Sequence, residues 1–176
     1  MKKTFSLWQF AGFAFTSFIG TLLHFLYDWC GQSLFIAPFS AINESTWEHM
    51  KLFFFPAFIF ALIESRFLRK NMQNFWCVKL IGIFSGLLLI PVLFYTYNGI
   101  FGTSPDFVNI SIFFISAAFA YWLEVKLFQK ESLACRSPFL PLIALFFIAV
   151  LFILFTFKTP QIPLFQDPIT VLYGIQ

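Results

Sequence analysis

Two short groups of polar residues interrupt an otherwise apolar chain, and their side chains are of types that carry chemistry. In the first group, His24 and Asp28 stand four residues apart. On a helix, residues at this spacing lie on one face. A carboxylate beside an imidazole can orient it as an acid, a base or a metal ligand. The alternative is that Asp28 reaches toward water while His24 hydrogen-bonds to a neighbouring helix.

The second group is the decapeptide N-E-S-T-W-E-H-M-K-L, residues 43–52. Ser45 followed by Glu48 three residues later is a capping box, which predicts that a helix begins here. Glu48 and His49 are neighbours in sequence, so their side chains point about 100° apart on that helix. If the helix extends back to Glu44, then Glu44, Glu48 and Lys51 share a face. Such a cluster also fits a surface group of ion pairs, worth about 0–1 kcal/mol.

These groups supply the candidate site residues. The candidate catalytic residues are His24, Asp28, Glu48 and His49. The candidate ligand-binding residues are Asn43, Glu44, Trp47, Lys51, Tyr97 and Asp167. Imidazoles and carboxylates are ligand types for zinc, and five of these residues have them, namely His24, Asp28, Glu44, Glu48 and His49. No H-E-x-x-H or comparable spacing is present, so we favour a plain polar cluster and keep zinc as the alternative.

The composition identifies the solvent of this chain as lipid. Hydrophobic residues make up 60% of the 176 residues and charged residues only 11%, whereas a soluble domain has about 25% charged residues. A core of this size could not bury 30 phenylalanines away from water. No basic run with interleaved aromatic residues suggests a nucleic-acid partner. We therefore expect an integral membrane protein in contact with the bilayer.

The pattern of apolar stretches predicts an all-α bundle with about five membrane spans. A span needs roughly 20 mostly apolar residues. The predicted spans, together forming a domain over residues 1–157, are 5–27, 47–67, 76–97, 107–125 and 139–157. Residues 158–176 hold three prolines, which block a continuous helix. We expect this tail to be an irregular surface segment. It is predicted to fold over the outer end of the first span, the 43–51 motif and the corner at residues 95–99, as a lid on a polar pocket at the outer interface.

The basic residues predict which way the bundle crosses the membrane. Cytoplasmic segments carry an excess of Lys and Arg. With the amino terminus inside, nine of the eleven basic residues are inside and only Lys51 and Lys158 are outside. The tail is then extracytoplasmic. Glu64 and Glu124 are expected to be interfacial charges near helix ends.

The three cysteines predict no disulfide in this orientation. Cys30 lies alone on the outside, and Cys77 and Cys135 lie near the cytoplasmic face. Disulfides are rare in the reducing cytoplasm. A G-x-x-x-G pattern at Gly82 and Gly86 predicts close packing against another helix, more simply within this chain than with a second copy.

The decapeptide and several other stretches resemble a known family. N-E-S-x-W-E-H-x-K-L followed by F-F-F-P is similar to the hallmark of a family of small bacterial multi-pass membrane proteins of unknown function. Three further stretches fit the same family, namely residues 23–27, 90–97 and 163–170. The ending Val171-Leu172-Tyr173-Gly174 departs slightly from the pattern. The resemblance implies a bacterial cytoplasmic membrane as the location, and it implies no activity.

Three classes of function stay open. The first is a binding protein whose polar site at the outer membrane interface takes a small molecule or lipid head group. The second is a membrane-embedded hydrolase at that interface, with or without a metal. The third is a structural or accessory subunit, in which the decapeptide serves folding. Polar residues at mid-depth are few, among them Ser17, Ser85 and Ser116, which argues against a full translocation path. We favour the first class.

Overall fold

Five long helices make up most of the chain. The structure is a computed structural model, which describes residues 2–69, 72, 74–102, 105–130, 135, 137 and 139–175, with side chains from residue 6 onward. The helices are α1 (Lys2–Trp29), α2 (Thr46–Leu68), α3 (Phe75–Phe101), α4 (Asp106–Phe128) and α5 (Phe139–Phe157). One turn of 3-10 helix, η2 (Pro163–Phe165), follows. The predicted all-helical fold is therefore confirmed, and each predicted span falls within one of these helices.

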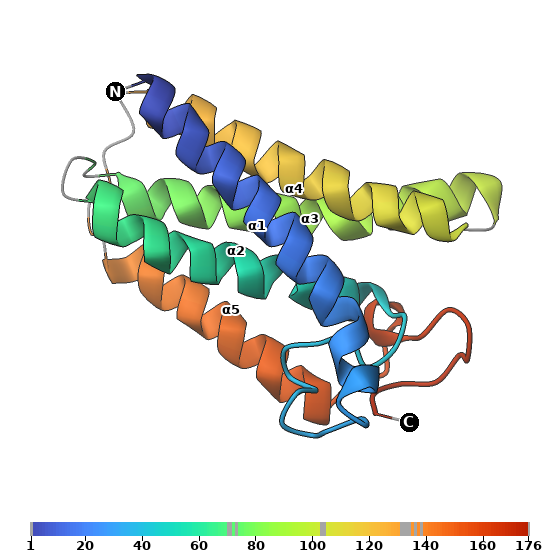
Figure 1. Ribbon diagram of the computed structural model, residues 1–176. Coiled ribbons are helices and arrows are strands. Elements are labelled where there is room, and N and C mark those ends of the chain that lie inside the picture. The colour runs from blue at the N-terminus through green and yellow to red at the C-terminus, as the bar shows by residue number, and fades with distance from the viewer. Residues whose placement is uncertain are drawn as a thin grey trace.

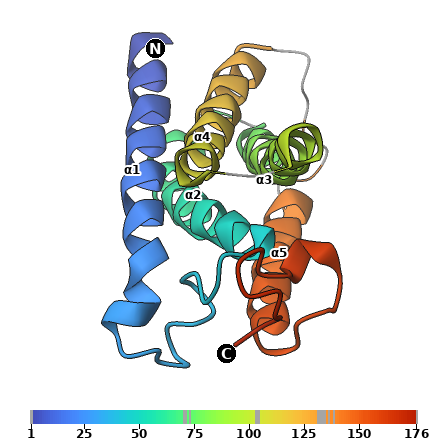
Figure 2. The same cartoon turned by 90° about the vertical axis from the view of Figure 1, so that its right-hand side faces the viewer.

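The helices run up and down between two ends of the bundle (Figure 1). One end, which we call the tail end, holds the α1–α2 connection, the α3–α4 connection and the residues after α5. The other, the amino-terminal end, holds the starts of α1, α3 and α5 and the ends of α2 and α4. Figure 2 shows α2 crossing between α1 and α5, with the tail beside the start of α2.

All five helices carry exposed apolar side chains, those of α2 including Ile59 and Phe67, but four of them are apolar along most of their length. Among the described residues, α1, α3, α4 and α5 are long and apolar enough to cross a membrane. Large apolar side chains on them are exposed, for example Phe10, Leu88, Ile115 and Phe147, as expected of a surface that contacts lipid. In contrast, α2 has 14 buried residues and carries Glu48, Lys51 and Glu64. It is the central helix, around which the apolar ones pack.

The start of α2 follows the predicted capping signal, with one change. Ser45 is the N-cap, and its side chain accepts a hydrogen bond from the Glu48 backbone N–H. Glu48 does not return the bond to Ser45, because its carboxylate accepts instead from the Ile42 N–H at 3.1 Å. The helix begins at Thr46, so Glu44 lies outside it. Glu44 therefore does not share a helical face with Glu48 and Lys51.

Glycine permits close helix contact inside the chain. A Cβ at Gly86 on α3 would lie 2.6 Å from the Phe53 ring of α2, and a Cβ at Gly82 would collide with Glu124 of α4. The G-x-x-x-G pattern thus packs within this chain, as predicted.

A buried charged cluster joins four helices. Lys79 of α3 forms ion pairs with Glu64 of α2 and with Glu124 of α4, the latter at 2.5 Å. Gln9 of α1 donates to Glu64 at 2.6 Å. Glu64 and Glu124 lie near the ends of α2 and α4, as expected, but they are buried inside the bundle rather than exposed at the interface, with exposed fractions of 0% and 1%. The physical reason is that Lys79 compensates them, which no local pattern in the sequence indicates.

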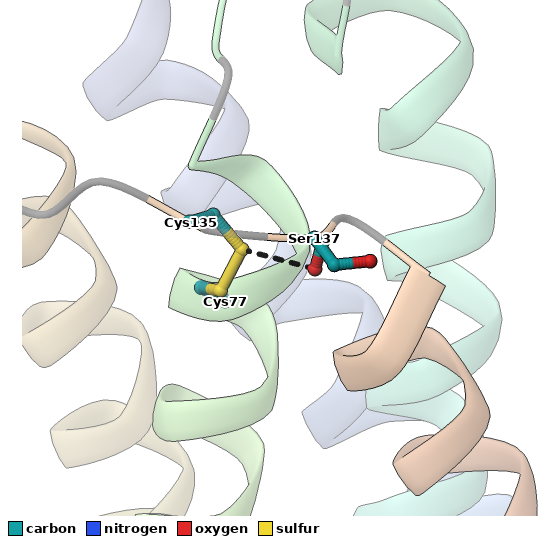
Figure 3. The surroundings of a disulfide bond; sticks show 3 residues. All are labelled: Cys77, Cys135 and Ser137. Carbon is teal, nitrogen blue, oxygen red and sulfur yellow. Dashed lines mark hydrogen bonds between the residues drawn. A yellow bond between two sulfur atoms is a disulfide. The ribbon is translucent and has the colours of Figure 1, made fainter.

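Cys77 and Cys135 form a disulfide at the amino-terminal end (Figure 3). Their Cα atoms are 5.9 Å apart across a sequence separation of 58 residues, within the usual range for a disulfide. The expectation of no disulfide is wrong for this structure. The antiparallel helices return the chain to the same end twice, and this brings the first turn of α3 beside the segment before α5.

The disulfide is expected to stabilise the bundle. Cross-links of this kind are typically worth about 2–4 kcal/mol. Reduction of the detergent-solubilised protein should lower its melting temperature by roughly 5–15 °C. A Cys77→Ser protein should start from the lower value and should not respond to reductant, whereas Cys30→Ser should behave as the wild type. An unchanged melting temperature on verified reduction would contradict the expectation.

Candidate functional site

The tail packs against the start of α2. Asn43 donates from its side-chain amide to the Gly174 carbonyl at 3.0 Å, and the Glu44 backbone N–H donates to the Asp167 carboxylate at 3.3 Å. Trp47 packs against Phe165 of η2 at 4.6 Å between ring centroids. The expected contact between the tail and the decapeptide is present.

Asp167 organises the tail that makes these contacts. One carboxylate oxygen accepts from the Ile169 and Thr170 backbone N–H groups, and the other accepts from Glu44. Val171 closes this turn with a φ of +63°. Because Asp167 is itself buried, its contacts serve to fix Glu44 rather than to present a free carboxylate.

Glu48 and Lys51 form a second buried pair, also at the tail end. Their charged atoms are 2.6 Å apart. The Lys51 ammonium also donates to the Ala37 carbonyl at 2.8 Å and to the Thr156 hydroxyl at 3.0 Å. These bonds tie the α1–α2 connection to α2 and α5. Both side chains are buried and stabilise the interior of the fold.

His24, Glu44 and His49 converge on one point. The His24 Nε2 lies 3.6 Å from one Glu44 carboxylate oxygen, and the His49 Nε2 lies 3.5 Å from the other. One ligand atom from each residue can be chosen so that all three are within 4.8 Å of one another. The three residues come from α1, the connection before α2, and the first turn of α2. This is the one such His and carboxylate group found in the described part of the chain.

Neighbouring bonds hold the three side chains in place. The His49 Nδ1 lies 3.0 Å from the Ser45 carbonyl oxygen, so Nδ1 carries the proton and Nε2 presents its lone pair. Ser40 anchors the connection to α1 by accepting from the Tyr27 N–H and donating to the Leu23 carbonyl. The connection is thereby held beside His24, where Glu44 can reach it.

The Glu44 carboxylate is ionised at neutral pH. The approach of the His24 imidazole outweighs the opposing effect of burial and lowers the pKa of Glu44 below its ordinary value. A lowered pKa means that this contact stabilises the fold above the ordinary pKa of a glutamate. That contribution is lost as the pH falls through the lowered value.

A cavity of about 430 Å³ opens beside the three residues. Its wall is mostly apolar, and its polar groups come from α1, the α1–α2 connection, α2 and the start of α4. The lining residues are Gly20, Thr21, His24, Phe25, Glu44, His49, Leu52, Asp106, Asn109, Ile110, Phe113, Phe114 and Ile169. We call this space the chamber. Ile169 shows that the tail forms part of its wall.

Several candidate residues lie elsewhere. Asp28 is exposed, and the His24 Nδ1 that it was expected to orient is buried without a hydrogen-bond partner in the described part of the chain. Tyr97 packs on Phe101 at the end of α3, away from the chamber wall. Trp47 stacks among aromatic rings of α5 and η2. Of the ten candidates, the structure brings His24, Glu44 and His49 together at the chamber.

Two chamber residues were missed in the sequence. Asp106 and Asn109 lie in the first turn of α4 and line the chamber. The only local signal was that Asp106 precedes an apolar stretch predicted to begin at the same face of the membrane as the decapeptide. Sequence spacing does not reveal that the start of α4 reaches α1.

Comparison with known proteins gives a family and no activity. A family model described as a family of unknown function (DUF6512) matches residues 1–175. No curated protein and no solved structure matches the chain.

Proposed function

We propose that this chain, which belongs to the family of unknown function DUF6512, binds an amphiphilic small molecule or lipid head group in the chamber. The observation that carries the proposal is a cavity of about 430 Å³ with an apolar wall and one polar corner. Small-molecule sites are typically concave, about 300–1,000 Å³ in volume and mostly apolar, with a few polar groups that orient the ligand.

The chemistry of the wall favours an amphiphile. Phe25, Phe113 and Phe114 offer apolar surface, which suits a hydrocarbon portion. The imidazoles of His24 and His49 and the carboxylate of Glu44 lie together, which suits a polar portion able to exchange hydrogen bonds.

We place the chamber at the outer face of a bacterial cytoplasmic membrane. The excess of Lys and Arg at the amino-terminal end supports this orientation, and the resemblance of the decapeptide supports the location. The Cys77–Cys135 disulfide at the amino-terminal end is the one observation against this orientation, because disulfides are rare at a cytoplasmic face. Two of the basic residues counted there, Lys70 and Arg136, lie outside the described residues.

Filling the chamber is expected to weaken ligand binding. Ile110 lines the chamber on α4, and a tryptophan there would occupy the space that a ligand needs. We expect Ile110→Trp to bind a fluorescent lysophospholipid at least roughly tenfold more weakly, which corresponds to about 1.4 kcal/mol. Fluorescence anisotropy in detergent micelles measures the affinity.

A matched variant separates loss of the chamber from a general effect of bulk. Ile115 lies on the same helix, is about as exposed as Ile110 (54% against 58%) and is not part of the chamber wall. Ile115→Trp should bind the probe as the wild type does. Equal affinities of the two folded variants would contradict a ligand site in the chamber.

A further inference from the structure

We infer that His24, Glu44 and His49 are the protein ligands of a zinc ion, with the remaining coordination position open to the chamber. The ligand set stands on its own geometry, and only the use of the open position rests on the proposed function.

The distances fit a shared ion better than direct hydrogen bonds. Nitrogen–oxygen separations of 3.6 and 3.5 Å are too long for good hydrogen bonds, which fall at about 2.7–3.2 Å. Zinc bonds to nitrogen and oxygen of about 2.0–2.2 Å in a tetrahedron place neighbouring ligand atoms about 3.4 Å apart. The two histidine–Glu44 separations, each to a different carboxylate oxygen, are close to this spacing, and one ligand atom from each of the three residues can be chosen with all three within 4.8 Å of one another.

The tautomer of His49 is the one that a metal requires. Ligating groups must be deprotonated at the bonding atom. The Ser45 carbonyl accepts the Nδ1 proton of His49, so its Nε2 is free to bind. This pairing of a ligating imidazole with a backbone carbonyl is the usual support for metal-bound histidine. Glu44 is held from its backbone side by Asp167, so its carboxylate is presented toward the two rings.

The number of ligands indicates what the ion would do. Structural zinc sites have four protein ligands, whereas catalytic sites have three and an open position. Here two imidazoles and one carboxylate face a chamber with room for a ligand. The matching class of reaction is hydrolysis of an ester in the amphiphile, in which water adds across the C–O bond and an acid and an alcohol leave.

The experiment is a zinc titration of the purified full-length protein in detergent after treatment with a chelator. Zinc affinity is measured by competition with a chromophoric chelator, and geometry by the visible absorption of Co²⁺ in the same site. We expect one zinc per chain and the strong visible band of four-coordinate Co²⁺. Glu44→Gln should weaken zinc binding about 100-fold or more, given that even outer-shell changes cost 10–100-fold.

Asp28→Asn is the matched control, because it removes a nearby carboxylate that is not in the cluster. It should bind zinc as the wild type does. His49→Gln is a second test, so that the inference does not depend on whether Glu44→Gln folds. Circular dichroism and gel filtration establish folding for each protein.

The outcomes separate this inference from the proposed function. A folded wild type that binds no zinc, or that prefers iron, overturns the zinc site, and so does equal loss of affinity in Glu44→Gln and Asp28→Asn. Lysophospholipid binding to the zinc-free wild type is measured in parallel. If the protein binds the probe but no zinc, the ligand site in the chamber stands and the zinc site is refuted. If it binds zinc but not the probe, the zinc site stands and the ligand site is refuted.

Discussion

Replacing Lys79 by methionine is expected to lower the yield of folded protein several-fold. Lys79 is 1% exposed and pairs with the buried carboxylates of Glu64 and Glu124. Methionine fills a similar volume but leaves two carboxylates unpaired in the interior of the bundle. Breaking a buried ion pair by removing one partner costs about 3–5 kcal/mol, and two carboxylates lose their partner here. The yield of monodisperse protein by fluorescence-detected gel filtration should fall several-fold.

A compensating variant tests the cause of that loss. Glu64→Gln and Glu124→Gln together with Lys79→Met remove all three charges while keeping the shapes of the side chains, and replacing a buried ionic cluster by neutral groups is often neutral. The triple variant should therefore recover most of the yield. Lys126→Met is the matched control, because Lys126 is exposed on α4 beside Trp122, and it should have little effect. A well-folded Lys79→Met protein would show that the pairing does not hold the four helices together.

Replacing Lys51 by methionine is expected to lower the free energy of unfolding by about 3–5 kcal/mol. The Lys51 ammonium is fully buried and contacts Glu48, the Ala37 carbonyl and the Thr156 hydroxyl. Methionine would leave the Glu48 carboxylate unpaired and the Ala37 carbonyl without its donor. A melting temperature lower by roughly 10 °C is the expected result, together with faster proteolysis of the α1–α2 connection.

The same pair also decides between a structural and a chemical role for Glu48. A Glu48→Gln, Lys51→Met protein lacks both buried charges and should regain part of the lost stability. If Glu48 only supports the fold, this double variant keeps lysophospholipid binding in the chamber. If the double variant is as stable as the wild type but does not bind the probe, Glu48 takes part in ligand binding. Lys158→Met, at an exposed lysine of the tail end, is the control for loss of positive charge and should behave as the wild type.

The helices and their order follow from the sequence by itself. An apolar stretch of about 20 residues in lipid must satisfy its backbone hydrogen bonds internally, and a helix is how a single segment does this. The start of α2 was also predictable, because Ser45 offers an acceptor to the N–H of Glu48 within one turn. Both signals depend only on residues close together in sequence, so they do not depend on how the helices pack.

The candidate site was predictable only as a set of residue types. The sequence offered His24, Glu44 and His49 among ten candidates, with Asp28 as the partner of His24. Which of them meet depends on where α2 begins and on the path of the connection that Ser40 and Asp167 hold in place. A helix beginning at Thr46 rather than Glu44 turns the Glu44 carboxylate toward the histidines and separates it from Lys51.

Only the tertiary structure decided the pairings over long sequence separations. Lys79 and Glu124 are 45 residues apart, and the disulfide joins residues 58 apart. A residue buried in a bundle can meet any of several helices, and spacing along the chain does not say which. Apolar character and helical caps are properties of single segments, so the sequence determined them. Compensation of buried charge and convergence on a cavity are properties of contacts between segments, so they became defined when the helices packed.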